Sequence, residues 1–209
     1  TARDFMQRLK SRLGLVRLIL GYDSALGKDR EGTVPRLTEI GAELGYAVET
    51  VSALSNESGV ISSTEIRKLV TVGKIEEAAK LMSRPYRLQG VVIRGDQRGR
   101  TIGFPTANLD YSDDKLISSN GIYACWAKLG NERFKAAVNI GFNPTFTPDK
   151  KTMSVEAYLL DFDRDIYDEN LQLEFVARLR DELKFESVEM LVEQILEDVK
   201  QTRILLRTA

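Results

Sequence analysis

The chain has 209 residues, of which 43% are hydrophobic and 29% are charged. These fractions are typical of a folded globular protein, and the length suits one large domain or two small ones. The 30 Lys and Arg residues and 31 Asp and Glu residues leave a formal net charge of −1. The chain as a whole therefore has no electrostatic reason to bind nucleic acid or an anionic membrane.

Histidine is absent from the sequence, and this absence excludes several kinds of catalytic site. It removes Ser-His-Asp and Cys-His catalysis, a histidine general base and a histidine-ligated zinc ion. The single cysteine, Cys125, cannot form an intrachain disulfide, and its apolar neighbours predict a buried position. We find neither a signal peptide nor an apolar stretch of the roughly 18 residues that a membrane helix needs. We therefore expect a cytoplasmic protein without membrane contact.

Apolar spacing near the N-terminus predicts alternating helices and strands. Helical spacing runs over 4–13 and again over 34–44. Short apolar runs at 16–20 and 46–51 are typical of strands, and a polar loop is expected over 21–32. A strand, a helix and a strand at this spacing form a βαβ unit, which predicts a parallel sheet.

Two further helices are expected before the chain reaches Pro85. Ser62 is followed three residues later by Glu65, which is the spacing of a capping box. A helix should therefore begin there and end near Gly73. A second helix is expected over 75–82, and it ends before Pro85 because proline disfavours helix in the preceding residue.

The character of the sequence changes at Pro85, and we place a domain boundary there, with one domain over 1–84 and another over 85–209. Beyond the boundary, short runs rich in Val, Ile, Tyr and Phe alternate with Gly, Pro, Asn and Asp. The pattern predicts an antiparallel all-β domain, for which a barrel is the natural architecture. The runs are 87–94, 122–128, 133–140, 153–160 and 171–179.

A C-terminal helix is expected from about Ser187, which is a suitable N-cap residue. Apolar residues recur along the predicted helix at helical spacing and form one stripe. The members of the stripe are Val188, Leu191, Val192, Ile195, Leu196 and Val199.

The densest cluster of unusual residues lies between 90 and 108. Four glycines fall within 14 residues and three arginines stand near them, which suits a loop whose backbone N–H groups approach phosphates. The spacing is not that of a Walker A loop, because three residues separate Gly95 from Gly99 and Arg100 follows. A tight hairpin on a solvated barrel is the alternative interpretation.

Thr106 and Asn108 stand two residues apart in an extended stretch, so their side chains point the same way. A hydroxyl and an amide carbonyl are hard oxygen ligands, suited to a Mg²⁺ ion that keeps waters and bridges nucleotide phosphates. The alternative is a turn in which these side chains bond their own backbone. Spacing alone does not separate the two.

Glu156 is a carboxylate on an otherwise apolar strand, and it shares one face with Ser154 and Tyr158. In a chain without histidine, a carboxylate is the natural general base for activating a hydroxyl group. The alternative is that this face of the strand is simply solvated.

Five motifs in the second domain stand in the same order as in riboflavin kinases. They cover 103–108, 120–123, 139–146, 155–162 and 179–185. From about Arg84 onward the chain therefore resembles a riboflavin kinase module, whose fold is a six-stranded antiparallel Greek-key barrel with a C-terminal helix. The resemblance implies Mg²⁺- and ATP-dependent phosphorylation of the riboflavin 5′-hydroxyl to FMN.

The resemblance also implies roles for individual residues. Thr106 and Asn108 would hold Mg²⁺ and the ATP phosphates, and Glu156 would accept or orient the proton of the 5′-hydroxyl. Arg180 and Phe185 would lie near the flavin. The glycine-rich loop would cover the ATP phosphates, and its residues are Gly95, Gly99, Arg100 and Gly103.

The first domain resembles the later half of the FMN adenylyltransferase domain of bacterial bifunctional FAD synthetases. The resemblance rests on the segments 20–23, 27–32 and 61–67. In that family the last segment contacts ATP phosphates, which suits the free N–H groups at a helix start, although by itself it is an ordinary capping box. The residues so implied are Gly21, Asp23, Ser62, Ser63, Thr64 and Arg67.

The His-x-Gly-His motif of that family is absent, since the chain has no histidine. We therefore expect upstream residues to be missing, and no FMN adenylyl transfer from this chain alone. The predicted fold is a partial nucleotidyltransferase segment of Rossmann-like α/β type, followed by the all-β barrel.

Riboflavin and ATP are the expected partners, with homo-oligomer formation left open. The alternative function is a non-catalytic barrel that binds nucleic acid or flavin. A net charge of −1 argues against the nucleic-acid alternative, because such proteins usually carry a basic patch.

Overall fold

The structure, a computed structural model, describes residues 1–56, 59–142 and 153–207. The chain forms two compact units, Thr1–Ile61 and Ser62–Ala209. Helices α3 (Ser63–Thr71) and α4 (Ile75–Met82) belong to the second unit. The domain boundary placed before Pro85 rests on the change in sequence character there, and it stays a prediction. Part of the motif over 139–146 lies outside the described residues.

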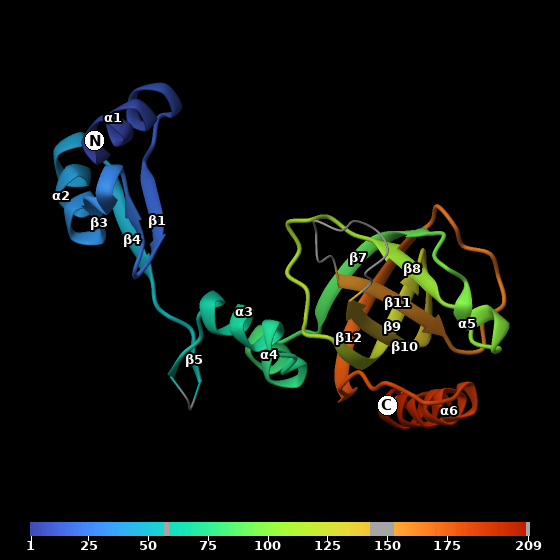
Figure 1. Ribbon diagram of the computed structural model, residues 1–209. Helices are drawn as coiled ribbons and strands as arrows, with labels where there is room; N and C mark the ends of the chain where they lie inside the picture. The colour runs from blue at the N-terminus through green and yellow to red at the C-terminus, as the bar shows by residue number, and fades with distance from the viewer. Residues whose placement is uncertain (57–58, 143–152, 208–209) are drawn as a thin grey trace. The chain divides into compact units, whose positions relative to one another are not determined.

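The first unit contains the predicted βαβ arrangement (Figure 1). Strand β1 (Arg17–Gly21) pairs in parallel with β4 (Ala47–Val51), and helix α2 (Val34–Leu44) connects them. Helix α1 (Ala2–Leu13) begins with a capping box and ends at a glycine in the left-handed region. The helices and the sheet bury a small apolar core of Ala2, Met6, Leu37, Ile40 and Tyr46.

Short elements that the sequence did not predict lie in the loops of this unit. The expected polar loop contains β2 (Ala25–Leu26), a 3₁₀ turn η1 (Lys28–Arg30) and β3 (Gly32–Thr33), with β2 and β3 paired antiparallel. Strands β5 (Ser55–Asn56) and β6 (Gly59–Val60) form a second small hairpin. Strands of two residues are too short to show an alternating pattern, so periodicity cannot reveal them.

Six strands of the second unit close into an antiparallel barrel in the order β10-β11-β8-β7-β12-β9 (Figure 1). Strands β9, β10 and β11 pair in sequence order, and β12 returns to lie beside β9, which is the Greek-key arrangement. The predicted architecture is therefore confirmed. The strands are β7 (Tyr86–Ile93), β8 (Ala107–Asp110), β9 (Gly121–Leu129), β10 (Glu132–Phe142), β11 (Met153–Leu159) and β12 (Asn170–Arg180).

Alternate residues of each strand fill the barrel, and the residues between them form its outer wall. The interior is apolar and closely filled, because every strand contributes side chains that are almost fully buried. Representative interior residues are Leu88, Tyr123, Val138, Val155, Leu173 and Phe175, each at most 1% exposed. The predicted burial of Cys125 is confirmed as well.

Helix α6 (Val188–Leu205) begins after the predicted N-cap Ser187 and packs on the outer wall over β9, β10 and β12 (Figure 1). The predicted apolar stripe is only partly correct. Val188 and Leu196 are each 54% exposed, whereas the polar residues Asp198 and Thr202 are buried. The inner face of α6 is therefore partly polar, since the barrel wall offers Asp198 a charged partner there.

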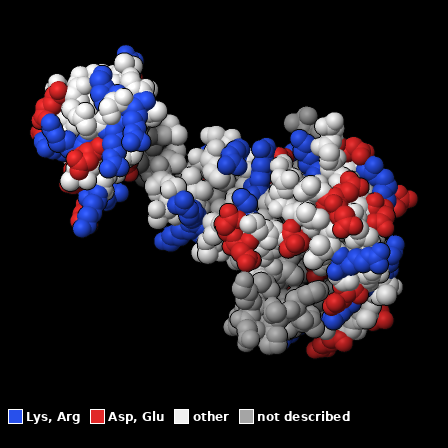
Figure 2. All heavy atoms as spheres, turned by 90° about the horizontal axis from the view of Figure 1, so that it is seen from above, with Lys and Arg blue, Asp and Glu red and all other residues white. Residues whose placement is uncertain are grey.

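Charged side chains of both signs are intermixed on the face of each unit that Figure 2 shows. Intermixed charges produce a weaker long-range potential than a patch of one sign would. Among the described residues, no helix is both long enough and apolar enough to cross a membrane.

Gly90 allows β7 and β8 to approach each other closely. A Cβ atom at this position would lie 2.3 Å from the backbone oxygen of Asp110, which cannot swing aside as a side chain can. We expect Gly90→Ala to lower the free energy of unfolding by about 1–3 kcal/mol, measured by urea denaturation. The control Gln89→Ala, at the exposed neighbouring position, should change it by less than about 0.5 kcal/mol. Equal stability of the two variants would contradict the close approach.

Candidate functional site

Glu156 lies on the outer wall of the barrel, in the middle of β11. Its neighbours Val155 and Ala157 are 1% and 0% exposed, so they fill the barrel interior. Glu156 points the other way and is half-buried. Strand alternation thus places a single carboxylate on a wall that surrounding segments partly cover.

The strand register places an asparagine on each side of Glu156. Asn108 of β8 is its partner in one neighbouring strand, and Asn139 of β10 is its partner in the other. Side chains directly opposite each other in antiparallel strands have Cβ atoms about 4.5–5.5 Å apart. The three polar side chains therefore form one row across the outer wall.

Thr106 contacts Glu156 directly. Its hydroxyl donates a hydrogen bond of 3.2 Å to Oε2 of Glu156, although the two residues are 50 positions apart in the sequence. Pro105 precedes Thr106 and fixes the backbone at the entrance to β8. The structure therefore brings together three of the residues that the sequence analysis selected, Thr106, Asn108 and Glu156.

Burial raises the pKa of Glu156 above its usual range. The hydrogen bond from Thr106 opposes this shift, and Asp96, Arg98 and Glu182 make smaller contributions of both signs. A carboxylate with a raised pKa is a stronger base than an ordinary glutamate, so it takes up a proton more readily.

The glycine-rich loop packs against Asn108. A Cβ atom on Gly95 would lie 2.4 Å from Nδ2 of Asn108, so only glycine fits without displacing the amide. Gly99 faces the Phe104 backbone oxygen in the same way, at 2.3 Å, and Gly103 adopts a φ of +89°. These close approaches and the positive φ explain the glycines physically, and they hold the loop against the row of polar side chains.

The loop also contains a short helix that the sequence did not predict, α5 (Arg98–Thr101). Arg98 pairs with Asp96 at 3.1 Å and remains 82% exposed. A four-residue helix has no periodicity that a sequence could reveal. The arginines of this loop thus stand at the surface near the row.

A cavity of about 400 Å³ opens beside Thr106. Interior residues such as Val92 and Leu159 form its apolar floor, and Arg100, Arg164 and Tyr167 contribute polar and aromatic groups. The sequence analysis missed Arg164 and Tyr167, since they lie on a loop after β11 and only the barrel closure brings them next to Thr106. The cavity thus combines an apolar floor with polar and charged groups, Asp163 and Asp165 included, and can hold a small molecule.

A second cavity, of about 450 Å³, lies between α4 and the end of β12. Gly73, Glu77, Arg178 and Arg180 are among its lining residues. This cavity is open, and Thr106 lines only the first of the two cavities, where its hydroxyl also bonds to Glu156, so we place the candidate active site there.

The two residues implied to lie near the flavin are Arg180, the last residue of β12, and Phe185, in the segment between β12 and α6. The guanidinium of Arg180 forms two hydrogen bonds to Asp198 on α6, of 2.8 and 2.7 Å. Phe185 is half-buried in the segment that leads to α6. Neither residue is among those that line the cavity beside Thr106.

Asn139 is a further residue of the site that the sequence analysis did not select. Its Oδ1 atom is buried and has no hydrogen-bond partner, which is one of only two such side-chain atoms in the described part of the chain. A buried acceptor without a donor costs about 1–3 kcal/mol. Two signals were available: Asn139 opens the motif 139–146, and asparagine is rare in the middle of a strand.

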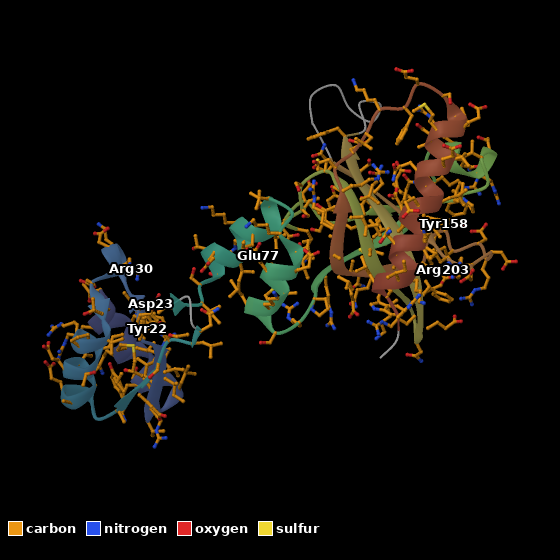
Figure 3. All side chains as sticks on the ribbon, turned by 90° about the horizontal axis from the view of Figure 1, so that it is seen from below. Tyr22, Asp23, Arg30, Glu77, Tyr158 and Arg203 are labelled. Carbon is orange, nitrogen blue, oxygen red and sulfur yellow. The ribbon has the colours of Figure 1, made fainter. Side chains whose placement is uncertain are left out.

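The residues implied for adenylyl transfer fall into the two units. Gly21 and Asp23 belong to the first unit, where Arg30 donates a hydrogen bond of 2.9 Å to the Asp23 backbone oxygen (Figure 3). Ser62 caps α3 in the second unit by accepting from the Glu65 backbone N–H at 3.1 Å, as predicted. The remaining members, Ser63, Thr64 and Arg67, lie in the first turns of α3.

A magnesium ion has a chemically suitable donor set at this site. Among the described residues, no group of three or more Asp, Glu, Cys or His side chains could hold a metal. The hydroxyl of Thr106 and the amide oxygen of Asn108 are instead hard oxygen donors, close to the carboxylate of Glu156. Two such ligands fit an ion that takes its other ligands from phosphates and water.

Family models match both parts of the chain. The model for riboflavin kinase matches residues 82–206, and the model for FAD synthetase matches residues 1–65. The first match covers more than half of the chain and includes the barrel, the row of polar residues and the glycine-rich loop. The chain therefore belongs to the riboflavin kinase family.

Similar proteins occur in several bacteria. The bifunctional riboflavin kinase/FMN adenylyltransferase of Listeria monocytogenes is 39% identical over 199 residues, which is 95% of this chain and 63% of that protein. The protein of the same name from Bacillus subtilis is 33% identical over 201 residues, with the same two shares. The chain thus spans about two thirds of the length of these relatives.

A crystal structure described as a macrolide-efflux protein from Streptococcus pneumoniae has a similar fold. Its TM-score is 0.87 at 33% identity, and the similarity covers 97% of this chain and 65% of that one. The shared fold thus extends through the α/β segment as well as the barrel.

The raised pKa of Glu156 predicts a pH-dependent effect on stability. A carboxyl group whose pKa is higher in the folded state stabilises that state while protonated, and this contribution is lost as pH rises through the folded pKa. We expect Glu156→Gln to be more stable than the wild type at pH 7 and to lose this advantage below about pH 4, near the unfolded pKa. Thermal unfolding across this pH range measures the difference, with the exposed variant Glu193→Gln as control. If Glu156→Gln were less stable than the wild type at pH 7, burial of the ionised carboxylate would not cost folding free energy, and the prediction would be wrong.

Proposed function

We propose that this chain is a riboflavin kinase that transfers the γ-phosphoryl group of ATP to the 5′-hydroxyl of riboflavin, giving FMN and ADP. The proposal rests on the row of Asn108, Glu156 and Asn139. Thr106 is hydrogen-bonded to Glu156 and lines a cavity of about 400 Å³. This arrangement lies within the residues that match the riboflavin kinase family.

Glu156 is proposed as the general base. The proton of the 5′-hydroxyl passes to a carboxylate oxygen of Glu156, the hydroxyl oxygen forms a bond to the γ-phosphorus, and the bond from that phosphorus to ADP breaks. The raised pKa of Glu156 supports this role, because a base works best when its pKa is near the working pH. Thr106 holds the carboxylate in place through its hydrogen bond.

ATP is proposed to bind between the glycine-rich loop and the cavity. Gly95, Gly99 and Gly103 leave room for phosphates close to the backbone, and Arg100 can neutralise their charge. Tyr167 and the apolar floor of the cavity offer a planar and an apolar surface to the nucleoside. In phosphoryl transfer, positioning and charge neutralisation supply most of the catalysis.

Thr106 and Asn108 are proposed to hold Mg²⁺ through their side-chain oxygens. When bound, the ion would neutralise charge on the ATP phosphates. The Thr106 hydroxyl donates a hydrogen bond to Glu156, so the lone pairs of its oxygen remain available to a cation.

The flavin is proposed to lie toward Arg180 and Phe185. Riboflavin is a flat, largely apolar ring system with a polar chain, so it needs an aromatic neighbour as well as hydrogen-bond donors. The sequence between Arg180 and Phe185 offers both, at the end of β12 and before α6.

We do not expect FMN adenylyl transfer from this chain alone. Its relatives in Listeria and Bacillus carry both activities in their names, and the FAD synthetase model matches only residues 1–65. The resemblance assigns ATP binding in that reaction partly to a histidine motif, and this chain has no histidine. FAD formation by the purified chain would contradict this expectation.

The kinase activity can be tested by incubating the chain with riboflavin, ATP and Mg²⁺ and separating the flavins by chromatography. We expect FMN, and we expect Glu156→Gln to lower kcat by about 10²–10⁴-fold because the proton then has no acceptor. Glu193→Gln, which removes an exposed carboxylate of α6, is the matched control. A Glu156→Gln protein within threefold of the wild type would remove Glu156 from the mechanism.

The metal assignment can be tested by titrating Mg²⁺ in the same assay. We expect Thr106→Ala and Asn108→Ala each to raise the Mg²⁺ concentration at half-maximal rate by on the order of tenfold or more. Thr71→Ala, an exposed threonine on α3, should leave it unchanged. Unchanged titrations for both site variants would refute the ligand assignment.

A further inference from the structure

Two aromatic rings contact each other beside the outer wall of the barrel. The centroids of the Phe104 and Tyr158 rings lie 5.4 Å apart, with an angle of 76° between the ring planes. Aromatic pairs favour such an edge-to-face arrangement, because the positive edge of one ring meets the negative face of the other. Both residues are half-buried, so part of their apolar surface is removed from water. The pair is therefore a specific attachment between two segments that are far apart in the sequence.

Tyr158 belongs to the strand that carries Glu156. Alternation along β11 places both side chains on the outer wall, because Ala157 between them is fully buried. The register of β11 with β8 and β10 in the closed barrel fixes the backbone here. Arg203 of α6 lies near Tyr158 and forms two hydrogen bonds of 2.7 Å to Asp161, just beyond the end of β11 (Figure 3). The ring of Tyr158 thus stands on a firmly held part of the wall.

Phe104 is the residue at which the glycine-rich loop ends. Its backbone N–H donates a hydrogen bond of 2.8 Å to the Gly99 backbone oxygen. A Cβ atom on Gly99 would lie 2.3 Å from the Phe104 backbone oxygen, so the two backbones are in close contact. Pro105 follows, and the next residue is Thr106, whose hydroxyl is bonded to Glu156. Phe104 therefore joins the loop to the polar residues of the site.

The glycine-rich loop is attached to the barrel wall at its two ends. Between described residues, its hydrogen bonds and ion pairs stay within 96–104 and do not reach the barrel. At one end Gly95 packs against Asn108, which is the partner of Glu156 in β8. At the other end is the aromatic pair. Both attachments are to residues next to Glu156, so together they set the distance between the loop and this carboxylate.

This distance matters for phosphoryl transfer. The reacting hydroxyl is proposed to meet Glu156, and the glycine-rich loop is proposed to hold the phosphates of ATP. The attacking oxygen and the γ-phosphorus must be in line, and a shift of about 1 Å can lower the rate about a hundredfold. A loop without internal apolar residues to bury needs an attachment that holds it in place, and an aromatic ring at its end supplies one.

We propose that Tyr158 is a positioning residue for ATP: its ring holds the ring of Phe104, and through Phe104 it keeps the glycine-rich loop at a fixed distance from Glu156. The inference rests on the proposed kinase function and assigns a role in it to an aromatic pair on the outer wall. Tyr158 acts through Phe104 and takes no part in the transfer of the proton or the phosphoryl group.

The first test measures the attachment of the loop directly, in the chain without ATP. Arg98 is 82% exposed, so trypsin can cleave after it when the loop opens. We expect Tyr158→Ala to raise the rate of this cleavage by about three- to tenfold, because the edge-to-face contact is lost. Tyr158→Phe keeps the ring and should leave the rate unchanged. Trp126→Ala, which removes a half-buried ring from the outer wall of β9, is the matched control and should also leave it unchanged.

The second test measures KM for each substrate in the kinase assay. We expect Tyr158→Ala to raise KM for ATP by about three- to tenfold and to leave KM for riboflavin within about twofold. In a Phe104→Ala background the same substitution should change KM for ATP by less than about twofold, because the residue through which Tyr158 acts is gone. If Tyr158→Ala does not fold, Tyr158→Leu replaces it, since leucine keeps much of the apolar volume and lacks the ring.

Three outcomes would overturn the proposal. One is an unchanged cleavage rate and KM for ATP in a folded Tyr158→Ala protein. Another is a Tyr158→Phe protein that behaves like Tyr158→Ala, since the ring contact would then not be the cause. The last is an equal rise in KM for ATP and for riboflavin, which indicates a general loss of structure. A wild-type chain that forms no FMN would instead overturn the proposed function, and the role in ATP positioning with it. The cleavage test does not depend on kinase activity, so the two failures are distinguishable.

Discussion

Closure of the six-stranded barrel is the constraint on which the rest of the second unit depends. Closure leaves no free strand edge, so each strand has a fixed register with both neighbours. The apolar residues must then point inward, which forces the residues between them onto the outer wall. The row of Asn108, Glu156 and Asn139 is a direct result of this register. The barrel thus supplies a rigid base on which polar groups from separate strands are held at fixed spacing.

Partial burial gives the site its chemical character. Glu156 is partly buried on the outer wall, and this loss of water raises its pKa. The same desolvation costs folding free energy, so the groups that make the site useful also make it less stable. Helix α6 repeats this pattern at a second place, where Asp198 and Arg180 are buried as a pair. In both places polar groups are held in fixed positions at a cost in folding free energy.

Much of the fold could be predicted from the sequence. Helices α2 and α4 occur at the predicted residues, because their apolar spacing is regular and glycine or proline marks their ends. Five of the six barrel strands could be found by their composition, whereas β8 was missed because it has only four residues. The apolar stripe predicted for α6 was partly wrong. Spacing shows that a helix has an apolar side, but the residues of the barrel decide which side packs inward.

The sequence by itself determined the kinds of element, the Greek-key barrel through family resemblance, and Glu156, Thr106 and Asn108 as candidate residues. Only the tertiary structure decided which of these residues meet. The hydrogen bond from Thr106 to Glu156 spans 50 positions, and the pairing of Arg180 with Asp198 joins a strand to a helix. Asn139 became part of the site for the same reason. Local sequence fixes local geometry, whereas contacts between distant residues depend on how strands register and helices dock, and side-chain patterns do not encode these directly.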